Sequence, residues 1–223
     1  NIHQTPSKNI RLMSDFEKKI QQMTLITSEE DVRTISGVPS WMLVLLQKII
    51  EVKRVENISQ VWPNLELYMH GGVNFRPYKN QFEKLIPQAI NYLETYNASE
   101  GFFGIQDQKN SDEMLLMLDY GIFYEFIPIE DIDKQKAIPI WEVEIGKTYA
   151  LVISTNAGLW RYVIGDTVIF TCVSPYRIKI NGRIGQFINA FGEELIMDNA
   201  EKAIQIACEK THANVNEYTA GPK

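Results

Sequence analysis

The feature that most constrains the fold of this chain is a change of hydrophobic pattern near residue 100. Before it, apolar residues recur at helical spacing, and short apolar runs typical of buried strands separate these stretches. After it, short runs rich in β-branched and aromatic residues alternate with turn residues. The pattern predicts an α/β (α+β) fold, with a small open α/β sheet unit up to about residue 105 and an antiparallel, barrel-like β section after it.

Individual elements follow from the same patterns. Ser14, with Glu17 three residues later, predicts a capping box at the start of the first helix. Residues 35–40 are expected to form a turn. We expect helices over about 14–26, 40–52, 77–85 and 199–210, and strands over about 65–69, 90–95, 101–105, 114–118, 121–128, 149–154, 167–173 and 176–180.

Composition excludes several classes of protein. The formal net charge of −6 comes with no basic stripe that would neutralise phosphates, so we expect no nucleic-acid partner. No apolar run is long enough to span a membrane, and the first residues lack the pattern of a signal peptide. Cys172 and Cys208 are expected to be reduced thiols. These features predict a cytoplasmic globular protein.

The first candidate site is the run Tyr-Asn-Ala-Ser-Glu-Gly at residues 96–101. Glu100 follows a predicted strand, where a carboxylate can bind a magnesium ion that bridges phosphate oxygens. The Ser99 hydroxyl can donate to a phosphate, and the Tyr96 ring can stack on a base. A solvated turn is the alternative interpretation.

The second candidate is Asp166, which follows Gly165 and could accept both hydroxyls of a ribose. An ordinary Gly-Asp hairpin turn is the alternative. Gly71 and Gly72 would let a ring or phosphate approach the backbone, or would only make a tight connection. His70 beside them is expected to be a packing residue, because no partner carboxylate is evident.

Other chemistries find less support. Arg183 could pair with a phosphate or lie on the surface. The chain has no zinc-ligand pattern and no Gly-x-Ser-x-Gly, so a serine-hydrolase interpretation fails.

Several motifs resemble one family. The run at 96–101 resembles the second nucleotide motif of the firefly-luciferase-like, adenylate-forming enzymes. Residues 162–166 resemble their Tyr-Arg-x-Gly-Asp motif, with Val163 where arginine is usual. The runs at 36–41, 70–73, 95–102, 158–162 and 187–194 resemble the auxin-responsive acyl-acid amido synthetases, in their bacterial branch, and the likeness extends from about Asn9 to Pro222.

The resemblance implies an activity. Such enzymes use ATP and Mg²⁺ to turn a carboxylic acid into an acyl-adenylate, and an amino acid then attacks to give an amide. By resemblance, Ser99 and Glu100 are the catalytic residues, with Glu100 on the metal. The implied substrate residue is Trp41, against the acyl group. The implied cofactor-binding residues are Tyr96 against adenine, Ala98 in the same motif, Asp166 on the ribose, Gly71, Gly72 and Val73 along the adenine or acyl pocket, and Arg183 at the hinge.

The resemblance also implies a domain organisation. Residues 1–183 correspond to the central and C-terminal part of the large domain, and residues 184–223 to the hinge and the start of a truncated C-terminal domain. The chain is therefore expected to be a central fragment that is inactive by itself and self-associates through exposed edges. An adenylate-forming enzyme with a thiol acceptor and a non-catalytic module that binds a nucleotide or partner stay open as alternatives.

Overall fold

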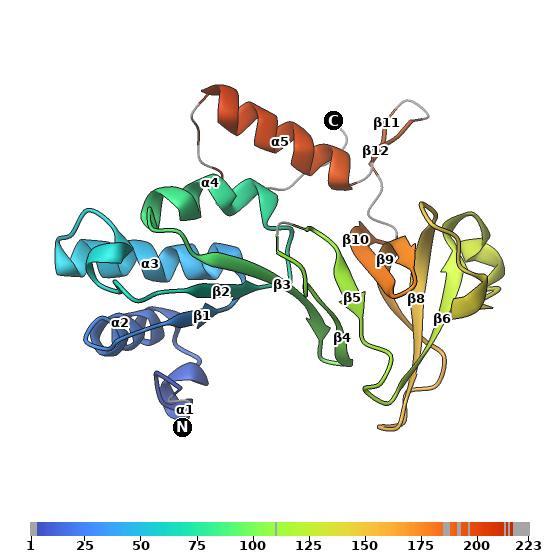
Figure 1. Ribbon diagram of the computed structural model, residues 1–223, viewed down its shortest axis with the longest axis horizontal. Coiled ribbons are helices and arrows are strands. Elements are labelled where there is room, and N and C mark those ends of the chain that lie inside the picture. The colour runs from blue at the N-terminus through green and yellow to red at the C-terminus, as the bar shows by residue number, and fades with distance from the viewer. Residues whose placement is uncertain are drawn as a thin grey trace. The chain divides into compact units, whose positions relative to one another are not determined.

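The chain forms two compact units (Figure 1). The computed structural model describes residues 4–109, 111–184, 188–190, 193–195, 197–211, 213 and 215. The first unit comprises Asn1–Leu93 with Asn214–Glu217, and the second comprises Glu94–Ala213 with Tyr218–Lys223. The chain passes from the first unit to the second within strand β3 (Asn91–Ala98).

The first unit combines helices with a pair of short parallel strands. Strands β1 (Thr34–Ser36) and β2 (Leu67–His70) pair in parallel, with Thr34 opposite Leu67. The helices are α1 (Lys8–Arg11), α2 (Phe16–Thr27), α3 (Pro39–Lys53), the 3₁₀ turn η1 (Ile58–Gln60) and α4 (Arg76–Leu85). The predicted helices at 14–26, 40–52 and 77–85 are thus confirmed within two residues at each end.

Local chemistry explains where these elements begin. Asp15, not the predicted Ser14, caps α2, because its carboxylate accepts a hydrogen bond of 3.0 Å from the amide of Lys18. The predicted turn at 35–40 is partly wrong, because Ile35 lies in β1 with its side chain buried. The unit's core is apolar and aromatic, and its fully buried members include Leu46, Ile49, Ile58, Trp62, Tyr68 and Phe82.

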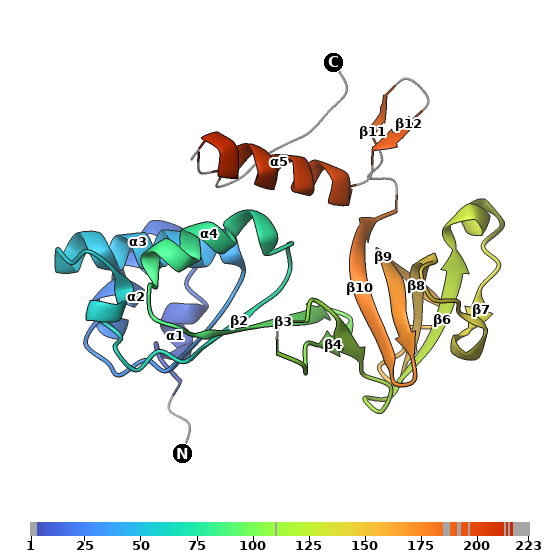
Figure 2. The ribbon, with the colours of Figure 1, turned by 45° about the horizontal axis from the view of Figure 1, so that its top comes forward.

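The second unit is a continuous antiparallel sheet. Its strand order is β3-β4-β5-β10-β9-β8-β6-β7, and Figure 2 shows β10, β9, β8 and β6 side by side in this order. The strands after β3 are β4 (Gly101–Ile105), β5 (Met114–Leu116), β6 (Ile122–Pro128), β7 (Ile138–Pro139), β8 (Thr148–Thr155), β9 (Tyr162–Val173) and β10 (Tyr176–Arg183). The second unit also contains two 3₁₀ turns, a separate hairpin and one helix. These are η2 (Ile129–Lys134), η3 (Ile140–Glu142), the hairpin of β11 (Ile188–Ala190) and β12 (Glu193–Leu195), and α5 (Met197–Thr211).

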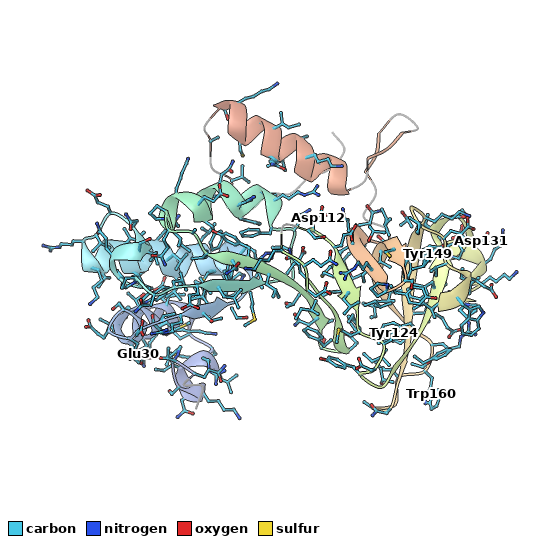
Figure 3. All side chains as sticks on the ribbon, viewed as in Figure 1. Glu30, Asp112, Tyr124, Asp131, Tyr149 and Trp160 are labelled. Atoms are coloured by element: carbon cyan, nitrogen blue, oxygen red, sulfur yellow. The ribbon has the colours of Figure 1, made fainter. Side chains whose placement is uncertain are left out.

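This sheet is strongly curled. Strands β3 and β9 lie four places apart in the sheet, which in a flat sheet is about 19 Å. Yet the hydroxyl of Tyr96 on β3 lies 2.8 Å from a carboxylate oxygen of Asp166 on β9. The concave side encloses one core that draws on β3 to β10, and Figure 3 shows its members Tyr124 and Tyr149 among the strands. The predicted barrel-like β section is therefore confirmed.

Several predicted boundaries in the second unit differ from those observed. Strand β9 begins at Tyr162, five residues before the predicted start, so Gly165 and Asp166 lie inside a strand and not in a hairpin turn. Strand β10 extends to Arg183, three residues beyond its predicted end at residue 180. The short elements α1, β1, β7, β11 and β12 were not predicted. Gly185, Phe187 and Gly192, which belong to the predicted hinge and its motif, lie outside the described residues.

Two general properties concern the whole described part of the chain. None of its helices combines the length and the apolar composition that crossing a bilayer requires. Cys172 and Cys208 are both free thiols, as predicted.

Candidate functional site

The first component of the site is a hydrogen bond between Tyr96 and Asp166. The Tyr96 hydroxyl donates to Oδ2 of Asp166 at 2.8 Å, although the two residues are 70 positions apart. Only 4% of Tyr96 is exposed, and its ring lies 5.0 Å from that of Phe103. Burial, and then the charge of Asp166, raises the pKa of Tyr96 far above its ordinary value, so the hydroxyl stays a donor at neutral pH.

The second component is an ion pair between Asp166 and Arg183. The two residues are opposite each other in the β9–β10 ladder, and Nε of Arg183 lies 2.9 Å from Oδ1 of Asp166. The Arg183 side chain is 57% exposed, whereas that of Asp166 is 18% exposed. The ion pair is therefore open to solvent mainly on its arginine side.

A bulge in β9 sets the direction of Asp166. Val152 of β8 is opposite Val163, but Ala150 is opposite Thr167, so β9 carries extra residues between these pairs. Gly165, within this bulge, has φ +92°, a conformation that favours glycine. Bulges of this kind redirect side chains and occur often beside functional sites.

Tyr96, Asp166 and Arg183 together form what we call the Asp166 cluster. Each carboxylate oxygen of Asp166 already accepts one hydrogen bond: Oδ2 accepts from Tyr96 on the core side, and Oδ1 accepts from Arg183 on the exposed side. The cluster thus offers an anchored acceptor and, next to it, a half-exposed cation. This combination suits a ligand that carries both hydroxyl groups and a phosphate.

The predicted metal site lies at the tip of the β3–β4 hairpin. Ala98 pairs with Gly101, which leaves Ser99 and Glu100 as the connecting residues. The Ser99 hydroxyl donates to Oε2 of Glu100 at 3.2 Å. A Cβ at Gly101 would lie 2.9 Å from Cδ1 of Ile122, so a side chain there would push this end of the isoleucine aside. From Tyr96 to Ala98 the strand advances about 7 Å, which places Glu100 beyond the Asp166 cluster along β3.

The residues fit magnesium only together with a phosphate ligand. Within the described ranges, no three His, Cys, Asp or Glu side chains gather as a protein-only metal site requires. Magnesium, however, is commonly bound by one or two carboxylates with phosphate oxygens and water. Glu100, partly exposed at the hairpin tip, is such a single carboxylate.

The remaining predicted residues belong to the first unit. Gly71, Gly72 and Val73 follow β2; Gly72 has φ +85°, and a side chain there would lie 3.3 Å from Val38. Trp41 on α3 is 56% exposed and packs edge-to-face against Phe16, with ring centroids 5.0 Å apart. Their roles toward a ligand stay predictions.

His70 lies in a packing position, in agreement with the sequence-based interpretation. It is 4% exposed, and its ring stacks on Phe75 with centroids 4.1 Å apart. Burial lowers the pKa of His70 to about 4, so the imidazole is neutral at physiological pH.

Sequence reasoning missed two contacts that organise the second unit. It treated Tyr96 as a platform for a base, but the ring is buried and its hydroxyl holds Asp166. It also missed the bidentate pair between Arg177 and Asp107, in which the arginine side chain is 8% exposed. No local pattern identifies either contact, because each joins residues 70 positions apart.

Comparison with known proteins first defines the class of fold. The GH3.15 acyl acid amido synthetase in complex with 2,4-DB superimposes with a TM-score of 0.70 at 14% identity, over 89% of this chain and 45% of that protein. A 2-hydroxyisobutyryl-CoA ligase in the postadenylation state gives a TM-score of 0.64 at 15% identity, over 84% and 40%. The fold is that of the adenylate-forming ligases.

Sequence similarity then gives the family. The model of the GH3 family N-terminal domain matches residues 1–90, and that of the GH3 family central domain matches residues 115–183. The chain belongs to the GH3 family. It is 31% identical over 123 residues to indole-3-acetic acid-amido synthetase GH3.3 of Arabidopsis thaliana, covering 51% of this chain and 20% of that protein. GH3.10 of the same plant is 25% identical over 189 residues, covering 73% and 31%. The chain thus spans a fifth to a third of the length of these relatives.

Proposed function

We propose that this protein activates a carboxylic acid with ATP as an acyl-adenylate and transfers the acyl group to an amino acid, forming an amide. The observation that carries the proposal is the Asp166 cluster, within a chain of the GH3 family. Adenylation makes the carboxyl carbon reactive by supplying a good leaving group. The reaction needs no protein nucleophile, so positioning and charge stabilisation are the tasks left to the side chains.

Each predicted site residue of the second unit has a task in this proposal. Asp166 accepts hydrogen bonds from the ribose hydroxyls, and Tyr96 holds that carboxylate in place. Arg183 neutralises phosphate charge. Ser99 donates to the α-phosphate, with Ala98 beside the nucleotide, and Glu100 is the protein ligand of the magnesium ion. Bound magnesium would offset the negative charge of the phosphates.

The substrate contacts, the acceptor, the cellular location and the self-association are proposals as well. Trp41, Gly71, Gly72 and Val73 are proposed to contact the acid or the adenine ring. An amino acid is the proposed acceptor, in keeping with the amido synthetases among the relatives. A cytoplasmic location and self-association through exposed edges are predictions from the sequence.

Nucleotide binding by the full gene product tests the site. We expect Asp166→Asn and Glu100→Gln to weaken the binding of ATP with magnesium at least ten-fold in isothermal titration calorimetry. Glu125→Gln is the matched control, because its carboxylate is also 18% exposed and also pairs with an arginine Nε, at 3.0 Å. Unchanged affinity in Asp166→Asn would remove the site assignment.

Substrate turnover tests the reaction. A pyrophosphate-exchange screen across carboxylic acids identifies the acid, because exchange requires a reversible adenylation step. Adding amino acids or coenzyme A in parallel then separates an amide-forming from a thioester-forming enzyme. Nucleotide binding without exchange for any acid would favour the non-catalytic module.

A further inference from the structure

We propose that Arg183 is a latch on the ribose-binding carboxylate: it occupies Asp166 when no nucleotide is bound and moves to the phosphate when a nucleotide enters. The inference rests on the proposed function and concerns the same site. It starts from the surroundings of the carboxylate that would receive the ribose, because each of its oxygens already accepts one hydrogen bond and Arg183 takes the side that is open to solvent.

Burial decides which of the two partners can leave. The Tyr96 ring is 4% exposed and packed in the core of the second unit, so its hydroxyl approaches Asp166 from inside. Arg183 is 57% exposed and lies on the solvent side of the same carboxylate. A ligand that arrives from solvent therefore meets the guanidinium first, and only the arginine can give way without disturbing the core.

The backbone around Arg183 is fixed, so the movement is confined to its side chain. Arg183 is held opposite Asp166 by the β9–β10 ladder, and the amide of Ile184 donates to the carbonyl of Gly165 at 2.7 Å. The guanidinium also passes close to Gly165, where a side chain would come within 3.8 Å of Nη2. A long, half-exposed side chain on a fixed backbone can exchange partners by rotating about its own bonds.

The chemistry of the ligand determines whether leaving Asp166 is favourable. A nucleotide brings a phosphate, which arginine binds at least as well as a carboxylate, so the charge of Arg183 is matched before and after the exchange. A nucleoside brings ribose hydroxyls but no phosphate, so Arg183 loses its partner and gains none. The latch therefore discriminates against unphosphorylated nucleosides.

The test compares adenosine and AMP on the full gene product and its Arg183→Met variant by calorimetry. In the variant Asp166 has no arginine partner, so adenosine no longer has to break an ion pair when it binds. We therefore expect adenosine to bind about 2- to 5-fold more tightly, which corresponds to the roughly 0.5–1 kcal/mol of a half-exposed ion pair. Because AMP loses its arginine partner, the preference for AMP over adenosine should fall at least five-fold.

Arg161→Met is the matched control. Arg161 is 62% exposed, and its Nε lies 3.0 Å from the carboxylate of Glu125, which is 18% exposed, in the same unit. Neither affinity should change in this variant. Arg183→Gln serves as a second variant if Arg183→Met does not fold, with the same direction expected for both ligands.

The outcomes separate the inference from the proposed function. Weakened or unchanged adenosine binding in both Arg183 variants, while the unsubstituted protein binds AMP, overturns the latch and leaves the proposed function standing. If the unsubstituted protein binds neither AMP nor ATP with magnesium, the proposed function is overturned and the latch falls with it. Tighter adenosine binding together with the reduced AMP preference supports both.

Discussion

Replacing Tyr96 with phenylalanine tests the contact on which the candidate site depends. The substitution removes one hydroxyl from a ring that is 4% exposed and leaves Oδ2 of Asp166 without its 2.8 Å donor. A hydrogen bond to a charged group contributes about 1.5–3 kcal/mol to stability. Since Asp166 is 18% exposed and water can partly replace the lost donor, we expect Tyr96→Phe to lower the free energy of unfolding by about 1.5–2 kcal/mol.

Tyr124→Phe provides the matched comparison. Tyr124 lies in the same unit and is equally exposed at 4%, but its hydroxyl donates at 3.0 Å to the neutral carbonyl of Met117. A neutral hydrogen bond contributes about 0.5–1.5 kcal/mol, so this substitution should cost less. Both variants conserve the packing of the ring, and the difference between them isolates the charge of Asp166.

Urea unfolding at pH 7 measures these costs, with hydrogen exchange of the β3 and β9 amides to assign the transition to the second unit. We expect the midpoint to shift while the slope of the transition stays constant. If Tyr96→Phe proves no more destabilising than Tyr124→Phe, then Asp166 does not depend on the tyrosine and the reasoning about the cluster is wrong.

Three further predictions concern stability. Burial raises the pKa of Tyr92 to about 12 from an ordinary value of 10.0, so the stability that the neutral hydroxyl contributes is present below pH 10 and is lost as the pH rises through 12. Between pH 10 and 12 this residue should make the free energy of unfolding, measured with urea at each pH, fall by about 1.4 kcal/mol per pH unit. In Tyr92→Phe this part of the fall should be absent, and an unchanged pH dependence would contradict the prediction. Hydrogen bonding from Arg177 lowers the pKa of Asp107, so the stability that this ion pair contributes is present above about pH 4 and is lost as the pH falls through the lowered pKa; Asp107→Asn should cost roughly 1–2 kcal/mol at pH 7, because the Asp107 side chain is 35% exposed, and less in acid, and an equal cost at both pH values would contradict it. Gly165→Ala places a side chain at φ +92° and should cost roughly 1–2 kcal/mol by thermal unfolding, with an unchanged midpoint as the contrary result.

The strands of the second unit could largely be predicted, because their β-branched and aromatic runs are separated by clear turn residues. The prediction for β4 matches the observed bounds Gly101–Ile105. Strand β9 was predicted too short because Gly-Asp usually marks a turn, whereas here a bulge and a positive φ at Gly165 let the strand continue through it. Strand β1 has only three residues, too few to produce a periodic signal.

The candidate site could be predicted only in part. Ser99 and Glu100 are neighbours in sequence, and a hairpin tip follows from the glycine after them. The approach of Tyr96 to Asp166 depends instead on the curl of the whole sheet, which no window of the sequence contains. Sequence patterns identified Asp166 and Arg183 separately, but the charge balance between them becomes visible only when β9 and β10 are paired.

The return of the chain to the first unit has a consequence for how the protein is made. Gln81, only 6% exposed on α4, donates from Nε2 to the carbonyl of Val215 at 3.1 Å, although 134 positions separate the two residues. On a ribosome, the helix that carries this glutamine emerges well before its acceptor does. The first unit therefore contains a side-chain amide whose native hydrogen bond can form only after the whole intervening sheet has been synthesised.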